Sequence, residues 1–190
     1  MSRFFWVRHG PTHAKAMVGW TDLPADLSDT AQLERLHGHL PEDALIISSD
    51  LSRAVHTADA IARSRQRLPH DPNLREINFG AWEMLGVNDI EDQAHLRAYW
   101  ETPGEVRAPN GESWNDVSER VNGAVTRLLD THPGRDFIVV AHFGVILTQV
   151  QVARAIPAVQ AFSHKIDNLS VTETRLKDGR WHVGAINHLP

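Results

Sequence analysis

The chain has 190 residues, 42% hydrophobic and 23% charged, which is the size and composition of one soluble globular domain. Its net charge of −5 and its lack of a basic tract argue against a nucleic-acid partner or an anionic membrane surface. It contains no cysteine, which excludes disulfides, thiolate catalysis and zinc–cysteine sites.

Neither a signal peptide nor a membrane span is expected. The first residues lack the basic region, long apolar core and cleavage site of a signal peptide. Residues 137–153 carry no Asp, Glu, Lys or Arg, but the stretch contains His142 and Gln149 and is short for a bilayer crossing. A buried strand that turns into a buried helix explains it better, so we expect a cytoplasmic protein without a membrane partner.

Three apolar runs predict short strands that are buried on both faces, at residues 4–7, 44–47 and 137–141. Between and after them, the spacing of apolar residues predicts a series of helices. We expect Ser28 to cap the first of these helices, with Asp29 in its first turn. The predicted helices cover about residues 31–40, 52–62, 90–102, 113–132 and 145–155.

The remaining segments predict connectors and a hairpin. Residues 68–74 contain two prolines and predict an extended connector or an edge strand. Residues 74–83 show no clear period and predict a loop. Asp178-Gly179 separates residues 169–176 from residues 180–186, which is a strong signal for a β-hairpin.

Strands that alternate with helices predict the fold class. The pattern indicates an α/β three-layer sandwich, in which a mainly parallel sheet has helices on both faces. The C-terminal hairpin adds mixed edge strands to this sheet. We expect residues 1–190 to form a single domain.

Arginine and histidine side chains follow directly after the predicted strands. Arg8 and His9 end the first strand, Arg53 lies just past the second, and His142 ends the third. Because open α/β sheets bind ligands beyond the carboxyl ends of their strands, we expect these side chains to face one crevice. A guanidinium fork fits phosphate oxygens, and an imidazole can act as nucleophile, acid or base.

Each of these residues also has a purely structural interpretation. Arg53 suits a surface arginine in a first helical turn, although a cation there opposes the helix dipole. His142 suits a satisfied core histidine, and Glu76 on the predicted loop suits a solvated carboxylate. Taken together, however, they supply two guanidiniums, two imidazoles and one carboxyl group, with no carboxylate cluster for a metal.

This set meets the needs of phosphoryl transfer to histidine without a metal or cofactor. Arg8, Arg53 and His142 would neutralise the phosphoryl oxygens, and His9 would accept the phosphoryl group to form a phosphohistidine. A protonated Glu76 would donate a proton to the leaving alkoxide and then, as a carboxylate, activate water.

The motif Arg8-His9-Gly10-x-Thr12 resembles the signature of the histidine phosphatase superfamily, the phosphoglycerate mutase-like enzymes. The resemblance implies the fold predicted above, a phosphohistidine mechanism, the site roles given above and a small-molecule phosphate ester as substrate. It extends along nearly the whole chain, in order, through Gly19-x-x-Asp22-x-Pro24, Ser48-Ser49-Asp50-Leu51-x-Arg53, Glu76-x-x-Phe79-Gly80-x-Trp82-Glu83, Pro109-x-Gly111-Glu112-Ser113, Val140-Ala141-His142 and Asn168-x-Ser170.

The chain departs from the family pattern at positions that bear on the substrate. Pro11 stands where many members have Glu, and Lys15 stands where an Asn often contacts the phosphate. Phe143 replaces the first Gly of the usual His-Gly-Gly, and Ala141 replaces a common Ser. The residues expected to bind the substrate are Thr12, Lys15, Trp20 and Phe143.

Three activities fit the family. A phosphomonoesterase is favoured, because only a small lid-like insertion at about residues 84–113 is available, whereas the mutases of this family are typically longer. Alpha-ribazole phosphatases are similar in size and carry the same segment around Glu76. The alternatives are a phosphoglycerate mutase and a catalytically weak phosphate-binding regulator, and the complete set of catalytic residues argues against the regulator.

A metal site is not expected. His37-x-His39 is the one pattern that suggests it, but two residues apart on a helix these side chains do not share a face. The sequence gives no indication of an oligomeric state.

Overall fold

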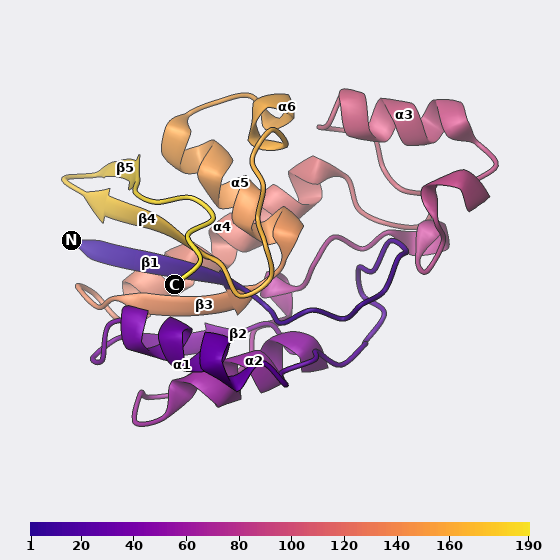
Figure 1. The fold of residues 1–190 in the computed structure, drawn as a ribbon. Helices are drawn as coiled ribbons and strands as arrows, with labels where there is room; N and C mark the ends of the chain where they lie inside the picture. The colour runs from indigo at the N-terminus through magenta and orange to yellow at the C-terminus, as the bar shows by residue number, and fades with distance from the viewer.

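One five-stranded sheet organises the protein, which a computed structural model describes over residues 1–190 (Figure 1). The strand order is β2-β3-β1-β4-β5. β1 and β3 are parallel, as are β2 and β3, whereas β4 is antiparallel to both β1 and β5. The strands are β1 (Ser2–Arg8), β2 (Leu45–Ser48), β3 (Phe137–Ala141), β4 (Val171–Lys177) and β5 (Arg180–Val183).

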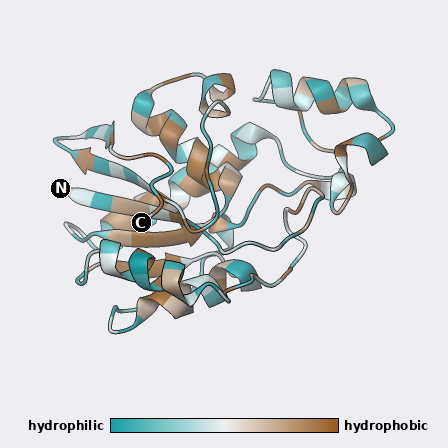
Figure 2. Ribbon diagram, viewed as in Figure 1, coloured by the Kyte–Doolittle hydropathy of each residue, from teal (hydrophilic) through white to brown (hydrophobic).

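Helices cover both faces of the sheet, because alternate strand residues point to opposite sides. On β1, Phe5 and Val7 pack in a core with α1 and α2, whereas Phe4 and Trp6 pack in a second core with α4 and α5. The brown strands at the centre of Figure 2 lie between these two layers. The helices are α1 (Thr30–His39), α2 (Ser52–Ala62), α3 (Gln93–Glu101), α4 (Trp114–Thr131), α5 (Phe143–Arg154) and α6 (Ala158–Ala161).

The structure confirms the predicted α/β three-layer sandwich and its mixed, mainly parallel sheet. It also confirms the C-terminal hairpin, in which Asp178-Gly179 joins β4 to β5 with positive φ at both residues. Residues 68–74 form a connector. An isolated parallel bridge joins Arg67, just before the connector, to Ile46. The N–H groups of Leu68 and Asp71 donate to the β2 carbonyls of Ile46 and Ser48, and a 3₁₀ turn covers Pro72–Leu74.

Three helix boundaries differ from the sequence prediction. The cap of α1 is Asp29 rather than Ser28, because the Asp29 carboxylate accepts the Gln32 N–H at 2.9 Å. α3 begins at Gln93 rather than near residue 90, since Asp92 caps it by accepting the His95 N–H. α5 begins at Phe143, directly after His142 and two residues earlier than predicted, and the short helix α6 was not predicted.

The segment that carries α3 stands beyond the end of the sheet (Figure 1). Aromatic contacts attach it: the ring of Tyr99 lies 5.3 Å from that of Trp82, and the ring of Trp100 lies 5.5 Å from that of Phe162. Trp82 and Trp114 are buried in the same core. None of the helices combines the length and apolar character that crossing a membrane requires.

Candidate active site

The candidate site lies at the carboxyl ends of the parallel strands. The His9 N–H donates to the Ala141 carbonyl at 3.1 Å, which continues the β1–β3 ladder one residue beyond Arg8. Because β1 and β3 end side by side, the rings of His9 and His142 lie 5.0 Å apart, and both residues are buried. The strand ends thus bring the two histidines together.

His9 is held by contacts that select one tautomer. Its Nδ1 lies 2.6 Å from the Gly10 carbonyl, which can only accept, so Nδ1 carries the proton and Nε2 is a free lone pair in the neutral ring. The Gly10 N–H donates to Thr57, and the Asn168 amide donates to the His9 carbonyl at 2.8 Å. Burial, together with the charges of Arg53 and Arg8, lowers the pKa of His9 to about 3.

His142 has one satisfied ring nitrogen and one without a partner. Nε2 lies 2.7 Å from the Ser49 hydroxyl, at the end of β2, and Nδ1 is buried without a hydrogen bond. Burial, followed by His9 and Arg53, holds the pKa of His142 well below its ordinary value. The second imidazole is therefore neutral near pH 7.

The two arginines are anchored through backbone carbonyls. Arg53 is 1% exposed and donates to the carbonyls of Gly19 and Thr21, at 2.5 and 2.9 Å. Arg8 donates from Nη1 to the Ile166 carbonyl at 2.6 Å, while its buried Nε has no partner. Burial lowers the pKa of both guanidiniums below its ordinary value, and both remain cationic.

Glu76 reaches the site from the loop between two 3₁₀ turns. Its Oε1 accepts the N–H of Ile77 at 2.9 Å and that of Gly144, in the first turn of α5, at 3.0 Å. Burial raises the pKa of Glu76 above 4.5, although these N–H groups and the two arginines act in the opposite direction. A Cβ at Gly144 would lie 2.5 Å from Oε1 and 2.8 Å from the Ile77 side chain, so any larger residue here would displace one or both of these side chains.

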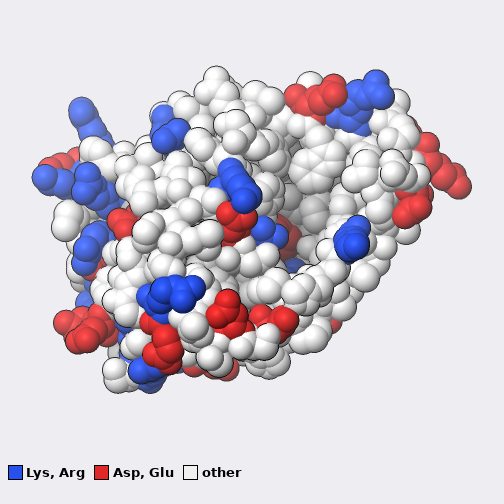
Figure 3. Space-filling model, in the orientation of Figure 1, with Lys and Arg blue, Asp and Glu red and all other residues white.

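These groups enclose a small cavity of about 120 Å³. One wall is formed by the loop segment 12–18, which contributes Thr12, Ala14, Ala16 and Val18. In Figure 3 a hollow opens beside the lobe that carries α3, with positive and negative side chains deep inside it. The cavity is lined by Arg8, His9, Thr12, Ala14, Ala16, Val18, Arg53 and Glu76.

The four residues expected to bind substrate occupy different positions. Thr12 lines the cavity, whereas Lys15 is exposed and is not part of its lining. Trp20 is 37% exposed, with its indole N–H donating to the Glu76 carbonyl at 2.8 Å. Phe143 is half-buried, and its ring centre lies 5.7 Å from the Arg8 guanidinium, within cation–π range.

Glu83 joins the Glu76 loop to the segment that follows β1. Its carboxylate accepts the N–H groups of Phe79, Gly19, Trp20 and Thr21, and also the Thr21 hydroxyl. Burial alone would raise the pKa of Glu83, but these hydrogen bonds outweigh it and lower the pKa. Residues 19–21 are consequently held between Glu83 and Arg53.

Sequence reasoning assigned no role to several residues that the structure places around the site. Ser49, Glu83 and Asn168 fall within the family motifs quoted above, and no other feature of the sequence indicates them. Thr57 follows the motif that ends at Arg53 by four residues, which is one helical turn. A different feature of the sequence indicates Arg120: it lies on α4 between the buried positions Val117 and Ala124, on the apolar side of the helix. A cation on the apolar stripe of a helix calls for an interior partner.

Most of the predicted catalytic residues meet at the cavity: Arg8, His9, Arg53 and Glu76 line it, and the His142 ring lies 5.0 Å from that of His9 at an angle of 55°. No group of three or more His, Asp or Glu side chains is arranged to hold a metal ion. Chemically, the cavity presents a neutral imidazole with a free lone pair, two guanidiniums and a carboxyl group with a raised pKa.

Comparisons with known proteins give three kinds of similarity. Residues 4–189 match the sequence model of the histidine phosphatase superfamily (branch 1). The adenosylcobalamin/alpha-ribazole phosphatase of Escherichia coli (strain K12) is 30% identical over 87% of this chain and 85% of its own. A probable phosphoglycerate mutase, GpmB, of Cronobacter sakazakii is 29% identical over 95% of this chain and 88% of its own. The structure of Bacillus stearothermophilus YhfR superimposes with a TM-score of 0.90 at 27% identity, covering 100% of this chain and 98% of that one.

Proposed function

The chain belongs to branch 1 of the histidine phosphatase superfamily, and we propose that it is a phosphomonoesterase that acts through a phosphohistidine on His9. The substrate is a small phosphorylated metabolite. The observation that carries this proposal is the state of His9: a buried imidazole with its proton on Nδ1, its Nε2 lone pair free and its pKa lowered to about 3. A phosphatase relative at 30% identity supports it.

In the first step the Nε2 lone pair of His9 attacks phosphorus, and the bond from phosphorus to the ester oxygen breaks. Arg8 and Arg53 stabilise the charge on the phosphoryl oxygens, which is where positioned cations contribute most. Two buried nitrogens without partners, Arg8 Nε and His142 Nδ1, are available as further donors. Glu76 gives its proton to the departing alkoxide, a role that its raised pKa favours.

In the second step water attacks the phosphohistidine. The Glu76 carboxylate takes a proton from this water, the nitrogen–phosphorus bond breaks, and the lone pair returns to His9 Nε2. The products are the alcohol and inorganic phosphate, and Glu76 is again protonated. Every proton transfer uses this chain's own side chains, so the proposed reaction needs no metal or cofactor.

Phosphoglycerate mutase is the second candidate, because the Cronobacter sakazakii relative carries that name. We propose that residues 84–113 form a small lid-like insertion in a single domain, and a small lid favours release to water over retention of the phosphoenzyme. With 3-phosphoglycerate and a bisphosphoglycerate primer, we expect hydrolysis to exceed isomerisation. Faster isomerisation would favour the mutase.

The primary test is hydrolysis of p-nitrophenyl phosphate in the presence of EDTA. Activity should persist in EDTA and should fall by at least about 10³-fold in His9→Ala, because the nucleophile is lost. His182→Ala, which removes an exposed histidine on β5, should retain activity. Full activity in His9→Ala would refute the mechanism, and loss of activity in EDTA would refute its independence of metals.

Two measurements complete the test. Quenching in base during turnover should trap an acid-labile phosphate on His9, and its absence at all rapid time points would count against the covalent step. A screen of phosphorylated metabolites would then identify the substrate.

A further inference from the structure

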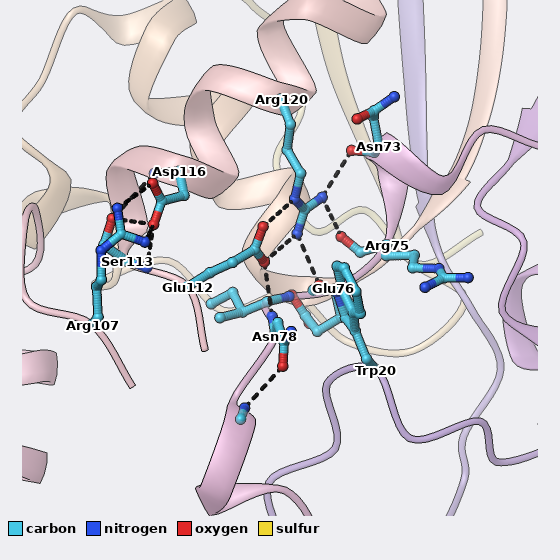
Figure 4. Close-up of polar contacts among 12 residues, drawn as sticks. Trp20, Asn73, Arg75, Glu76, Asn78, Arg107, Glu112, Ser113, Asp116 and Arg120 are labelled. Carbon is cyan, nitrogen blue, oxygen red and sulfur yellow. Dashed lines mark hydrogen bonds and ion pairs between the residues drawn. The ribbon is translucent and has the colours of Figure 1, made fainter. Parts of the chain in front are cut away.

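An ion pair between Arg120 and Glu112 lies against the loop that carries Glu76 (Figure 4). Arg120 Nε and Nη2 donate to the two Glu112 oxygens at 2.7 and 2.9 Å, a bidentate geometry. The two side chains are only 13% and 16% exposed. Such a pair loses hydration on burial and therefore needs further hydrogen bonds to be tolerated.

Those hydrogen bonds go to the backbone on both sides of Glu76. Arg120 donates to the carbonyls of Asn73, Arg75 and Glu76, at 2.8, 2.7 and 2.9 Å. Glu112 Oε2 accepts the N–H of Asn78 at 2.9 Å, and the Glu112 N–H donates to the Asn78 carbonyl at the same distance.

Residues 75–79 belong to no helix or strand, so their polar backbone groups depend on partners from elsewhere in the chain. The Arg120–Glu112 pair supplies most of these partners. Arg120 lies on α4, an 18-residue helix with a capping box at Ser113, and Glu112 immediately precedes that cap. The loop is thus attached to a rigid element.

We propose that Arg120 and Glu112 are positioning residues for the proton-transfer step, because they fix the backbone from which the Glu76 carboxyl reaches the cavity. This inference rests on the proposed role of Glu76 as general acid. A displacement of about 1 Å at a reacting group can cost about 10²-fold in rate. Lysine at position 120 would keep the charge but lose the planar fork that bonds three carbonyls and Glu112 together.

A defect in proton donation has a signature that loss of folding does not produce. An alkyl phosphate has a poor leaving group and needs the acid, whereas p-nitrophenolate leaves readily without a proton. A misplaced Glu76 should therefore slow alkyl phosphate hydrolysis selectively. A smaller folded fraction would lower both rates equally.

The test measures kcat and KM for 2-glycerol phosphate and p-nitrophenyl phosphate in Arg120→Lys and in Glu112→Gln. We expect kcat for the alkyl ester to fall by about 10- to 10²-fold, kcat for the aryl ester to fall far less, and KM to change little. Glu76→Gln sets the upper limit of the selective effect, about 10²- to 10⁴-fold.

Arg107→Lys is the matched control. Arg107 pairs with Asp116 near the start of α4, is 56% exposed and donates nothing to residues 73–78 (Figure 4). This variant should keep the ratio of the two kcat values at the wild-type level. A selective loss in Arg107→Lys equal to that in Arg120→Lys would overturn the proposal.

Unchanged alkyl phosphate hydrolysis in both variants would overturn the positioning role, as would an equal loss on both substrates. If Arg120→Lys does not fold, as judged by circular dichroism, Glu112→Gln decides the question by the same ratio. Failure of the proposed function looks different: wild type would hydrolyse neither substrate, or Glu76→Gln would show no selectivity.

Discussion

The two halves of the candidate site are built in different ways. The strand half, which comprises Arg8, His9 and His142, sits where β1 and β3 end, and the main-chain ladder of the sheet fixes its spacing. The loop half is the segment 75–83 with Glu76 and Glu83. Contacts with distant parts of the chain hold it, such as those from Arg120 to the Glu76 carbonyl and from the Gly19 N–H to Glu83. Single substitutions should therefore disturb the loop half more easily than the strand half.

Among the substitutions that test this comparison, the largest effect should come from breaking the contact between the halves. In Gly144→Ala the new Cβ would lie 2.5 Å from Glu76 Oε1 and 2.8 Å from Ile77, both on the loop half. We expect the Glu76 carboxyl to be displaced and kcat for an alkyl phosphate to fall by about 10²-fold or more, as measured by steady-state kinetics.

Gly38→Ala provides the control for that substitution. A Cβ at this exposed position of α1 meets nothing within 4 Å, so activity should be unchanged and stability should rise by up to about 1 kcal/mol. Wild-type activity in Gly144→Ala would show that the two halves adjust to each other more freely than the distances indicate.

A second prediction loosens the attachment of the loop half to residues 19–21. Glu83→Gln replaces a carboxylate that accepts five hydrogen bonds with an amide, whose NH₂ group faces N–H donors. We expect the free energy of unfolding to fall by about 1–3 kcal/mol, measured by urea denaturation. Glu119→Gln, an exposed site on α4, should change it by less than about 0.5 kcal/mol, and equal losses in the two variants would contradict the prediction.

A third prediction concerns the strand half and pH. The folded state keeps His9 and His142 neutral far below pH 6.5, whereas the unfolded chain protonates them there. Since the unfolded state then binds more protons, stability should fall as the pH drops below about 6.5, by about 1.4 kcal/mol per pH unit for each histidine. The raised pKa of Glu76 opposes this trend as the pH approaches 4.5.

Comparison of the wild type with His142→Asn isolates the contribution of His142 to the pH dependence of stability, because Glu76 is present in both proteins. Between pH 6 and pH 5, the stability of the variant should decrease with a slope that is smaller by about 1.4 kcal/mol per pH unit. Denaturant titrations at each pH measure this slope. Identical slopes would mean that His142 is protonated in the folded state.

The smallest effect is expected at Phe143. Phe143→Leu removes the aromatic face over Arg8 but retains the apolar bulk. A cation–π contact of this kind is worth about 1 kcal/mol, so KM for p-nitrophenyl phosphate should change by about two- to fivefold, with kcat nearly constant. A large fall in kcat would place Phe143 in the chemistry of the reaction rather than in binding.

Sequence patterns anticipate the strand half far better than the loop half. The apolar runs that end at Arg8, His9 and His142 define both the strands and their chemistry, so the proximity of the two histidines follows from parallel pairing. The mixed sheet and the hairpin at Asp178-Gly179 are likewise local signals, and the structure confirms them.

The loop half has no such local signal. The partners of the Glu76 backbone are Trp20 and Arg120, which are 56 and 44 residues away in the chain. No periodic pattern in the sequence predicts contacts between residues so far apart in the chain. The family motif identifies Glu76 but does not indicate which residues hold its backbone. The difference in the α1 cap has a local origin, because Ser28 and Asp29 are both residue types that cap helices, and it is the Asp29 carboxylate that accepts the Gln32 N–H.

The start of α5 places two neighbouring residues under unequal constraint. Gly144 has no room for a side chain beside Glu76, whereas Phe143 faces Arg8 at the edge of the site. On the mechanism proposed above, a gene that encodes this fold can vary codon 143 and alter the surroundings of Arg8, while codon 144 stays fixed and the Glu76 carboxyl keeps its place. New substrate preferences would then arise at this helix end without loss of the proposed proton donor.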